Sequence, residues 1–181
     1  MDHPFQLNET PQPTSRSSQE NLQLFLTASL QELYYANEVI GNAFNSIQKQ
    51  IVSPELEEVL NTHYSIHLNH KSRLEKIFQL HNTPAEYKDC PAVTALLAQA
   101  TEYLALFTQD IRNWEIALIL TSRKLAHYKI AAYGAAAHLA LSLQHAPSAT
   151  LLAVSVQEEE EYIEHYLNGL THVFLGPQKD I

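Results

Sequence analysis

Glycine and cysteine are both scarce in this sequence. Only 4 of the 181 residues are glycine, too few for a protein built on many tight turns. The single cysteine, Cys90, excludes an intramolecular disulfide and any metal site that needs several cysteines. Charged residues make up only 17% of the chain and hydrophobic residues 45%, which excludes wholesale disorder. Together these features indicate a folded and mostly helical protein.

Positive charge is also in short supply. The chain has 11 Lys and Arg against 20 Asp and Glu, which gives a net charge of -9. A surface this acidic is a poor electrostatic match for DNA, RNA or an anionic membrane, so we expect neither nucleic acid nor membrane as a partner. No apolar run reaches the 18 or so residues of a membrane span, and the first residues lack the pattern of a secretory signal. We therefore expect a cytoplasmic protein.

The sequence divides into three expected regions. Residues 1–17 are rich in proline and polar side chains without apolar periodicity, which predicts a disordered N-terminal arm. Residues 18–172 carry periodic apolar side chains and form the predicted helical domain. A short C-terminal tail is expected over residues 173–181, because Gly176 and Pro177 cannot continue a helix easily.

Apolar side chains recur at spacings of three and four within the helical domain. Ser17 and Glu20 have the spacing of a capping box, and Ser53 followed by Pro54 is a second helix start signal. The four long stretches cover about 18–47, 54–82, 110–143 and 148–170, and a shorter one follows Pro91. No stretch reads convincingly as a strand. The predicted fold is therefore all-α, a four-helix bundle with an additional short helix.

Polar side chains interrupt the apolar stripe in the middle of each long helix. The interruptions are Asn37 in the first helix, His63, His67 and His70 in the second, Lys129 in the third, and the run Glu158 to Glu161 in the fourth. In an antiparallel bundle these positions fall at one height and form a single polar layer. Burying such groups unpaired costs several kcal/mol, so we expect them to pair with one another or to bind something.

Two interpretations of this layer are open from the residues alone. Di-metal centres in bundles take Glu from two helices and a Glu-x-x-His from each of the other two. No Glu-x-x-His occurs here, and Glu161 and His165 are four residues apart. The second interpretation is a buried layer of hydrogen bonds and ion pairs that fixes the register of the helices.

Several segments resemble the YciE/YciF-type ferritin-like family of bacterial proteins. They are LQELYYANEVI (30–40), SPELEEVLNTH (53–63), RLEKIFQL (73–80), KDCPA (88–92), RKLAHYKIAAYG (123–134) and QEEEEYIEHYL (157–167). The resemblance covers roughly residues 24–170. It implies a ferritin-like four-helix bundle, a homodimer, a link to stress responses, and a candidate di-metal carboxylate site.

This chain departs from the family pattern at most of the carboxylate positions of that site. The substituted positions are Asn37, Ser65, Ile66, Gln99, Ala126 and Lys129, and only Glu158 and Glu159 keep their carboxylates. We expect Lys129 to pair with one of these two glutamates and so to replace the positive charge of the metal. The predicted remnant of the site is a polar layer that contains Asn37, His63, Gln99, Ala126 and Lys129.

The resulting functional prediction is a non-catalytic, stress-related bundle protein with a degenerate di-metal site and no cofactor. The alternative is a metal-binding protein or a di-iron oxidase or iron-handling enzyme, with iron or zinc held by His67, His70, Glu158 and Glu159. A third possibility is a small-ligand binder that uses a cavity left where the metals were.

Overall fold

The computed structural model describes residues 16–176, and all secondary structure in that part of the chain is helical. The predicted arm over residues 1–17 and the end of the predicted tail lie almost entirely outside the described residues. The elements in chain order are α1 (Ser18–Ile47), η1 (Gln48–Gln50), α2 (Pro54–Leu80), α3 (Pro91–Leu106), α4 (Ile111–Ser142), α5 (Ala146–Tyr162), η2 (Ile163–Leu167) and α6 (Asn168–Leu175). The prediction of an all-α fold is confirmed.

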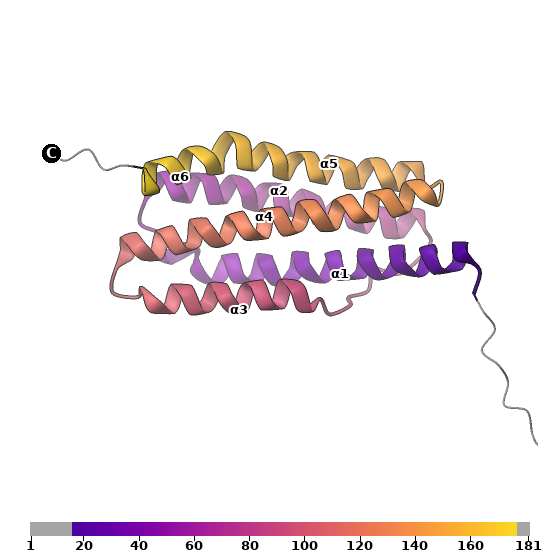
Figure 1. Cartoon of the computed structure of the whole chain (residues 1–181), viewed down its shortest axis with the longest axis horizontal. Helices are drawn as coiled ribbons and strands as arrows, with labels where there is room; N and C mark the ends of the chain where they lie inside the picture. Colours follow the sequence, from indigo (N-terminus) through magenta and orange to yellow (C-terminus); the bar gives the residue numbers. More distant parts are fainter. Residues whose placement is uncertain (1–15, 177–181) are drawn as a thin grey trace, which may run out of the picture.

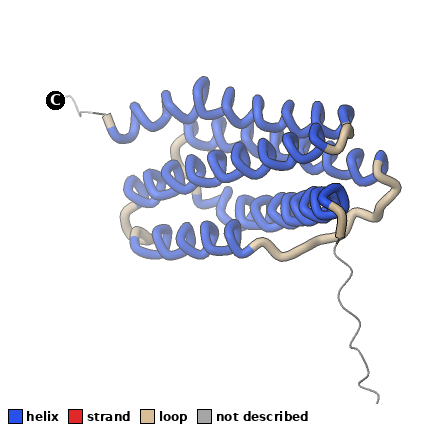
Figure 2. Tube along the Cα trace, turned by 45° about the vertical axis from the view of Figure 1, so that its right-hand side comes forward, coloured by secondary structure: helices blue, strands red, loops and turns tan. Residues whose placement is uncertain are grey.

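Four long helical rods lie side by side in the bundle (Figure 1). Helix α1 packs on α2 and α4, and α5 packs on the same two helices from the opposite side. The loop over residues 81–90, a long tan segment in Figure 2, and α3 bring the chain back along the bundle. Helices α2 and α4 therefore run in the same direction, as the sequence colours of Figure 1 show. Helix α3 lies outside the four rods, where it contacts mainly α4.

The helix start signals act as the sequence predicts. The Ser17 hydroxyl accepts a hydrogen bond from the Glu20 backbone N–H at 3.2 Å, and the Glu20 carboxylate accepts one from the Ser17 N–H at 2.6 Å. The Ser53 hydroxyl caps α2, and prolines open both α2 and α3. These caps satisfy amide groups that a helix terminus leaves without partners.

The last long helix differs from the prediction of one continuous helix. A π-helical turn, η2, separates α5 from α6. Tyr162 and Leu167, which are both fully buried, lie five residues apart at its two ends. An α-helix would turn these side chains away from each other, whereas a wider π turn directs both into the core. Helix α6 continues to Leu175, so residues 173–175, which were expected in the tail, are helical.

Two apolar cores occupy the two ends of the bundle. One contains Leu26, Leu30, Leu74, Ile77, Tyr133 and Leu152, and the other contains Leu56, Leu60, Trp114, Ile119, Tyr162 and Leu170. On each long helix the polar residues identified above lie between these two sets. The structure therefore places the polar layer at mid-height, as the sequence predicts.

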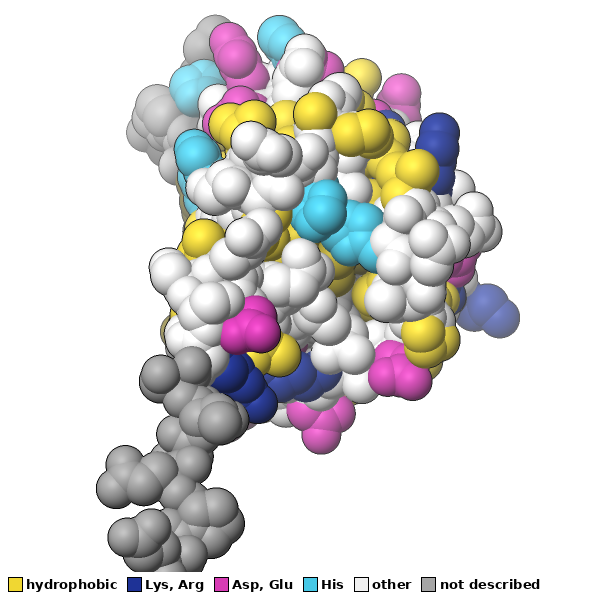
Figure 3. Space-filling view, turned by 90° about the vertical axis from the view of Figure 1, so that its right-hand side faces the viewer, with side chains coloured by type: hydrophobic (Ala, Val, Ile, Leu, Met, Phe, Trp, Pro, Cys, Tyr) yellow, Lys and Arg dark blue, Asp and Glu magenta, His cyan; other side chains and the backbone are white. Residues whose placement is uncertain are grey.

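The end of the bundle near the start of α1 carries a second group of histidines. His81, after the end of α2, and His145, before α5, have their ring centroids 4.7 Å apart. Figure 3 looks onto this end of the molecule and shows histidine side chains next to one another on a face with few charges near its centre. Among residues 16–176, no helix combines the length and apolarity that a membrane span requires.

Candidate functional site

An ion pair between Glu159 of α5 and Lys129 of α4 lies at the centre of the polar layer. The Glu159 side chain is fully buried and Lys129 is 1% exposed, and the Lys129 Nζ contacts Glu159 Oε1. His63 of α2 contacts the other carboxylate oxygen, Oε2, through Nε2 at 2.9 Å. Two helices, α2 and α4, thus supply partners to one buried carboxylate of α5, and the lysine pairs with Glu159 rather than with Glu158.

Glu158 forms a second ion pair at the edge of the layer. Arg73 donates two hydrogen bonds to its carboxylate, at 2.6 and 2.5 Å, in a bidentate arrangement. His70 contacts the same carboxylate through Nε2 at 3.0 Å, and its Nδ1 lies 3.5 Å from Glu159 Oε1. The His70 ring therefore lies between the two carboxylates. We call His63, His70, Arg73, Lys129, Glu158 and Glu159 the polar cluster.

Asn37 and His67 lie beside the polar cluster and bond to each other. Asn37 donates from Nδ2 to the Leu33 carbonyl at 2.9 Å and to the Tyr133 hydroxyl at 2.7 Å. His67 Nε2 lies 2.7 Å from the backbone carbonyl oxygen of Asn37, to which the ring nitrogen can only donate. A side chain at Gly41 would meet His67 Nε2 at 3.3 Å, so the glycine leaves room for this contact. His67 is thereby directed at α1 and not at the glutamates.

Burial keeps the three histidines of α2 neutral. Burial, reinforced by the charge of Lys129, lowers the pKa of His67 to about 3 and that of His70 to about 2. The pKa of His63 is also lowered, because burial outweighs the attraction of Glu159. Each neutral ring carries one N–H and one lone pair. With Nε2 donating to Glu158, His70 has no second N–H to offer Glu159.

Glu159 is ionised in spite of its burial. Burial alone raises the pKa of this carboxyl, but Lys129 and the contacts with His63 outweigh it and bring the pKa below its ordinary value. The hydroxyls of Tyr133 and Tyr162 lie close by and stay protonated, because burial raises their pKa values. The charges of the polar cluster are thus two carboxylates, one ammonium and one guanidinium.

The side chains of the polar cluster do not fit a di-metal carboxylate centre. The Lys129 ammonium group contacts the Glu159 carboxylate, and the Arg73 guanidinium group contacts the Glu158 carboxylate. A divalent cation here would have to displace both cations or be repelled by them. At the position of Asn37 the group that points toward the layer is an N–H donor to Tyr133. Within the described residues, no group of three or more His, Cys, Asp or Glu is arranged to hold a metal ion.

Most of the residues predicted for the former site do come together, but Gln99 does not. Ala126 is fully buried within the apolar core next to the layer. Gln99 is only partly buried on α3 and accepts a hydrogen bond from Lys124 at 2.5 Å near the surface. Placing Gln99 in the polar layer was therefore wrong. Helix α3 lies outside the four rods, so its polar side chains cannot reach the interior between α2, α4 and α5.

Sequence reasoning missed Arg73 and the role of Tyr162. Arg73 lies three residues after His70, one turn further along the same helix face, and this spacing was the available signal. Tyr162 stacks on His63 with ring centroids 3.9 Å apart and nearly parallel planes at 6°. Its hydroxyl is buried without a hydrogen-bond partner among the described residues.

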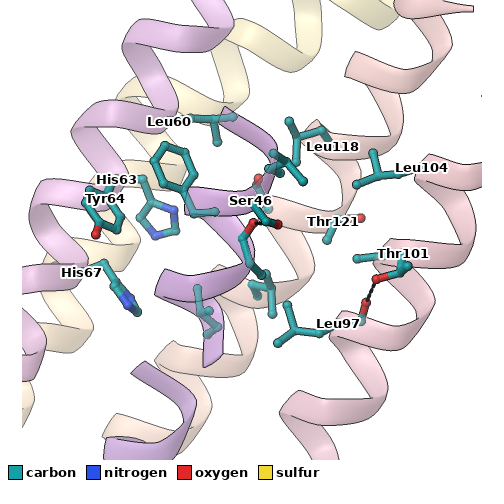
Figure 4. Close-up of a pocket in the computed structure, with 17 residues that line it drawn as sticks. Ser46, Leu60, His63, Tyr64, His67, Leu97, Thr101, Leu104, Leu118 and Thr121 are labelled. Atoms are coloured by element: carbon teal, nitrogen blue, oxygen red, sulfur yellow. Dashed lines mark hydrogen bonds between the residues drawn. The ribbon is translucent and has the colours of Figure 1, made fainter. Parts of the chain in front are cut away.

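A cavity adjoins the polar cluster on its α1 and α3 side. It measures about 130 Å³ and lies between α1, α2, α3 and α4. His63 and His67 form part of its wall, next to Tyr64 and Leu60 (Figure 4). His63 therefore separates the ion pairs on one side from an open space on the other.

Comparison with known proteins identifies the family. A family described as a domain of unknown function, DUF892, matches residues 21–172. The protein YciF of Escherichia coli K12 is 25% identical over 132 residues, which are 72% of this chain and 79% of YciF.

Two solved structures share the fold. The crystal structure of the E. coli stress protein YciF superposes with a TM-score of 0.78 at 22% identity, covering 87% of this chain and 98% of that one. YcfI from Rhodopseudomonas palustris superposes with a TM-score of 0.76 at 24% identity, covering 81% and 92%. The chain therefore belongs to the DUF892 family and has the ferritin-like helical fold of the YciF type.

Proposed function

We propose that this protein is a non-catalytic, stress-related bundle of the YciF type, in which ion pairs take the place of a di-metal centre. The observation that carries the proposal is the buried pair of Lys129 and Glu159 at mid-height of the bundle. An ammonium group there supplies the positive charge that a buried carboxylate needs.

The charges of the polar cluster support this function because they balance without a metal. The two carboxylates of Glu158 and Glu159 face one guanidinium and one ammonium, while His63 and His70 are neutral. The formal charges sum to zero. Removing the metal from a centre with four carboxylates would leave uncompensated charges, whereas this arrangement leaves none.

The proposed biological role rests on similarity to relatives alone. The E. coli relative is described as a stress protein, and we extend that role to this chain. We also propose a cytoplasmic homodimer, as the family resemblance implies. In this role the polar cluster fixes the register of α2, α4 and α5, because a shift by one turn would separate every ion pair.

A metal-binding function that uses His67, His70, Glu158 and Glu159 is the alternative, and the geometry favours it less. His67 bonds to the Asn37 carbonyl on α1, so it does not share a centre with the glutamates. His70 does contact both glutamates, but each already has a cationic partner. Metal binding through these four residues would require at least two existing contacts to break.

Elemental analysis tests the proposal. The protein is expressed without a histidine tag in medium supplemented with iron and zinc, purified without chelator, and assayed for metal content and for oxidation of ferrous iron. We expect far less than one equivalent of either metal per chain and oxidation no faster than in buffer. Two iron equivalents per chain with accelerated oxidation would overturn the proposal and restore a di-iron enzyme.

A further inference from the structure

The cavity beside His63 has the shape of a small binding site. Its wall comes from the second half of α1, the middle of α2, the second half of α3 and the first half of α4. Ser46 of α1 and Thr101 of α3 are exposed and lie at its border, so the cavity opens to solvent between these two helices. Figure 4 shows the apolar side chains of Leu60, Leu97, Leu104 and Leu118 around the space.

The lining of the cavity carries no charge. The seventeen residues around it include no Asp, Glu, Lys or Arg. The only titratable rings with shifted pKa values in the wall, those of His63 and His67, are kept neutral by burial. An ionised ligand would lose its hydration here without finding an opposite charge, so the lining selects against anions and cations.

Two hydroxyl groups in the wall lack hydrogen-bond partners. Thr121 and Ser122 of α4 are each 6% exposed, line the cavity, and form no side-chain hydrogen bond with the described part of the chain. The other buried serines of the described residues, Ser148 and Ser155, do have partners. His81 lies 2.9 Å from the Ser148 hydroxyl, and Arg73 donates to the Ser155 hydroxyl at 3.3 Å.

The oxygens of both hydroxyls keep accessible surface in residues that line the cavity, so a ligand held there can supply the hydrogen-bond partner that the protein does not. His63 adds a third polar atom. With Nε2 donating to Glu159, the Nδ1 of this ring carries a lone pair that can accept a hydrogen bond. The cavity therefore combines apolar walls with a few groups that can bond a hydroxyl.

We propose that this cavity binds an uncharged molecule of one ring that carries a single hydroxyl group, of the phenol class. The size agrees, since an apolar cavity of about 150 Å³ in another protein holds one benzene molecule. The aromatic or aliphatic ring would pack against the leucines, and the hydroxyl would bond to Thr121, Ser122 or His63. This site goes beyond the proposed function and does not depend on whether a metal is bound.

Binding of three matched probes tests the proposal. Phenol, toluene and benzoate are titrated into the full-length protein and followed by amide chemical shifts and by calorimetry. We expect phenol to bind with a dissociation constant in the millimolar range or tighter, toluene more weakly, and benzoate not at all. Absence of phenol binding at millimolar concentration would overturn the proposal and leave a cavity filled by water. Equal binding of benzoate would also overturn it.

Variants of the wall locate the bound molecule. The double variant Thr121→Val, Ser122→Ala removes both hydroxyls with little change of shape, and we expect it to weaken phenol binding about 5- to 10-fold while leaving toluene binding unchanged. Ala100→Leu fills the space from α3 and should abolish binding of both probes. The control Thr150→Val changes an exposed hydroxyl on α5, outside the cavity, and should change neither affinity. Phenol binding that survives Ala100→Leu would place the probe elsewhere and contradict the inference.

Discussion

The two sides of His63 differ in how they fill the centre of the bundle. Toward α4 and α5, the ring meets the Lys129–Glu159 ion pair, which is almost fully buried. Toward α1 and α3, the same residue borders an uncharged cavity of about 130 Å³. One side is dense and charged, and the other is open and neutral.

The difference has a physical origin in the packing of α3. Helices α2, α4 and α5 approach each other closely enough for their charged side chains to pair directly. Helix α3 lies outside the four rods, and the small side chains Ala43, Ser46, Ala100 and Thr101 do not fill the space between it and α1. The comparison teaches that paired charges fill the side where α2, α4 and α5 converge, while the side that faces α3 keeps open space.

The largest expected effect comes from breaking the charged side. Lys129→Met leaves Glu159 buried without its cation, and breaking one partner of a buried pair typically costs about 3–5 kcal/mol. We expect that loss in the free energy of unfolding, measured by urea denaturation. The double variant Lys129→Met, Glu159→Gln removes both charges and should recover most of the loss. A single variant as stable as the wild type would show that the pair contributes nothing.

Acid should weaken the polar layer through its neutral histidines. His67 and His70 have folded pKa values of about 3 and about 2, against about 6.5 when unfolded. The unfolded chain therefore takes up protons below pH 6.5 and the folded chain does not, so stability falls as the pH falls. We expect a loss of about 2 kcal/mol per histidine between pH 7 and pH 5.

Denaturation at a series of pH values checks this, with His70→Gln as the comparison. The variant should show a shallower pH dependence, because it has one neutral buried histidine fewer. A wild-type stability that stays constant from pH 7 to pH 5 would contradict the assignment of neutral histidines.

Adding volume should act in opposite directions on the two sides. Ala126 is fully buried in a packed core, so Ala126→Leu should cost about 1–3 kcal/mol through overpacking. Ala100 faces the cavity, so Ala100→Leu should be neutral or raise stability by about 0.5–1 kcal/mol. Thermal unfolding of the two matched variants measures the contrast. Equal destabilisation by both would mean that the cavity is not free space.

The smallest expected effect concerns the outer ion pair. Arg73 and Glu158 are about one-fifth and one-quarter exposed, so solvent screens their attraction. Arg73→Met should therefore cost only about 0.5–1 kcal/mol, well below the effect of Lys129→Met. Urea denaturation of both variants under the same conditions gives the ratio of the two losses in the free energy of unfolding. A cost as large as that of Lys129→Met would show that the partial exposure of the outer pair has no weakening effect.

Local sequence patterns were sufficient to predict the helices and the height of the polar layer. Ser17 and Ser53 mark helix starts through hydrogen bonds made within one turn, which a sequence encodes directly. The polar residues of the four long helices fall at mid-helix, so their meeting follows from antiparallel packing. The pairing of Lys129 with a glutamate followed from the same positions.

The features that were not predicted depend on how elements pack in three dimensions. Gln99 has the spacing of a layer residue, but the position of α3 outside the rods removes it from the interior. The π turn between Tyr162 and Leu167 arises because both side chains need to face the core. The cavity depends on the summed volumes of side chains from four helices, which no single pattern reveals.

The central claim is that Lys129 has replaced the metal, and thermal unfolding with added metal tests it most directly. The wild type and Lys129→Glu are heated with chelator, with ferrous iron and with zinc. Because a ligand that binds only the folded state raises the melting temperature, metal binding is visible at once. We predict that added metal leaves the melting temperature of the wild type unchanged. It should raise the melting temperature of Lys129→Glu, because the added carboxylate lacks a cation. A wild-type melting temperature that rises with either metal would contradict the account.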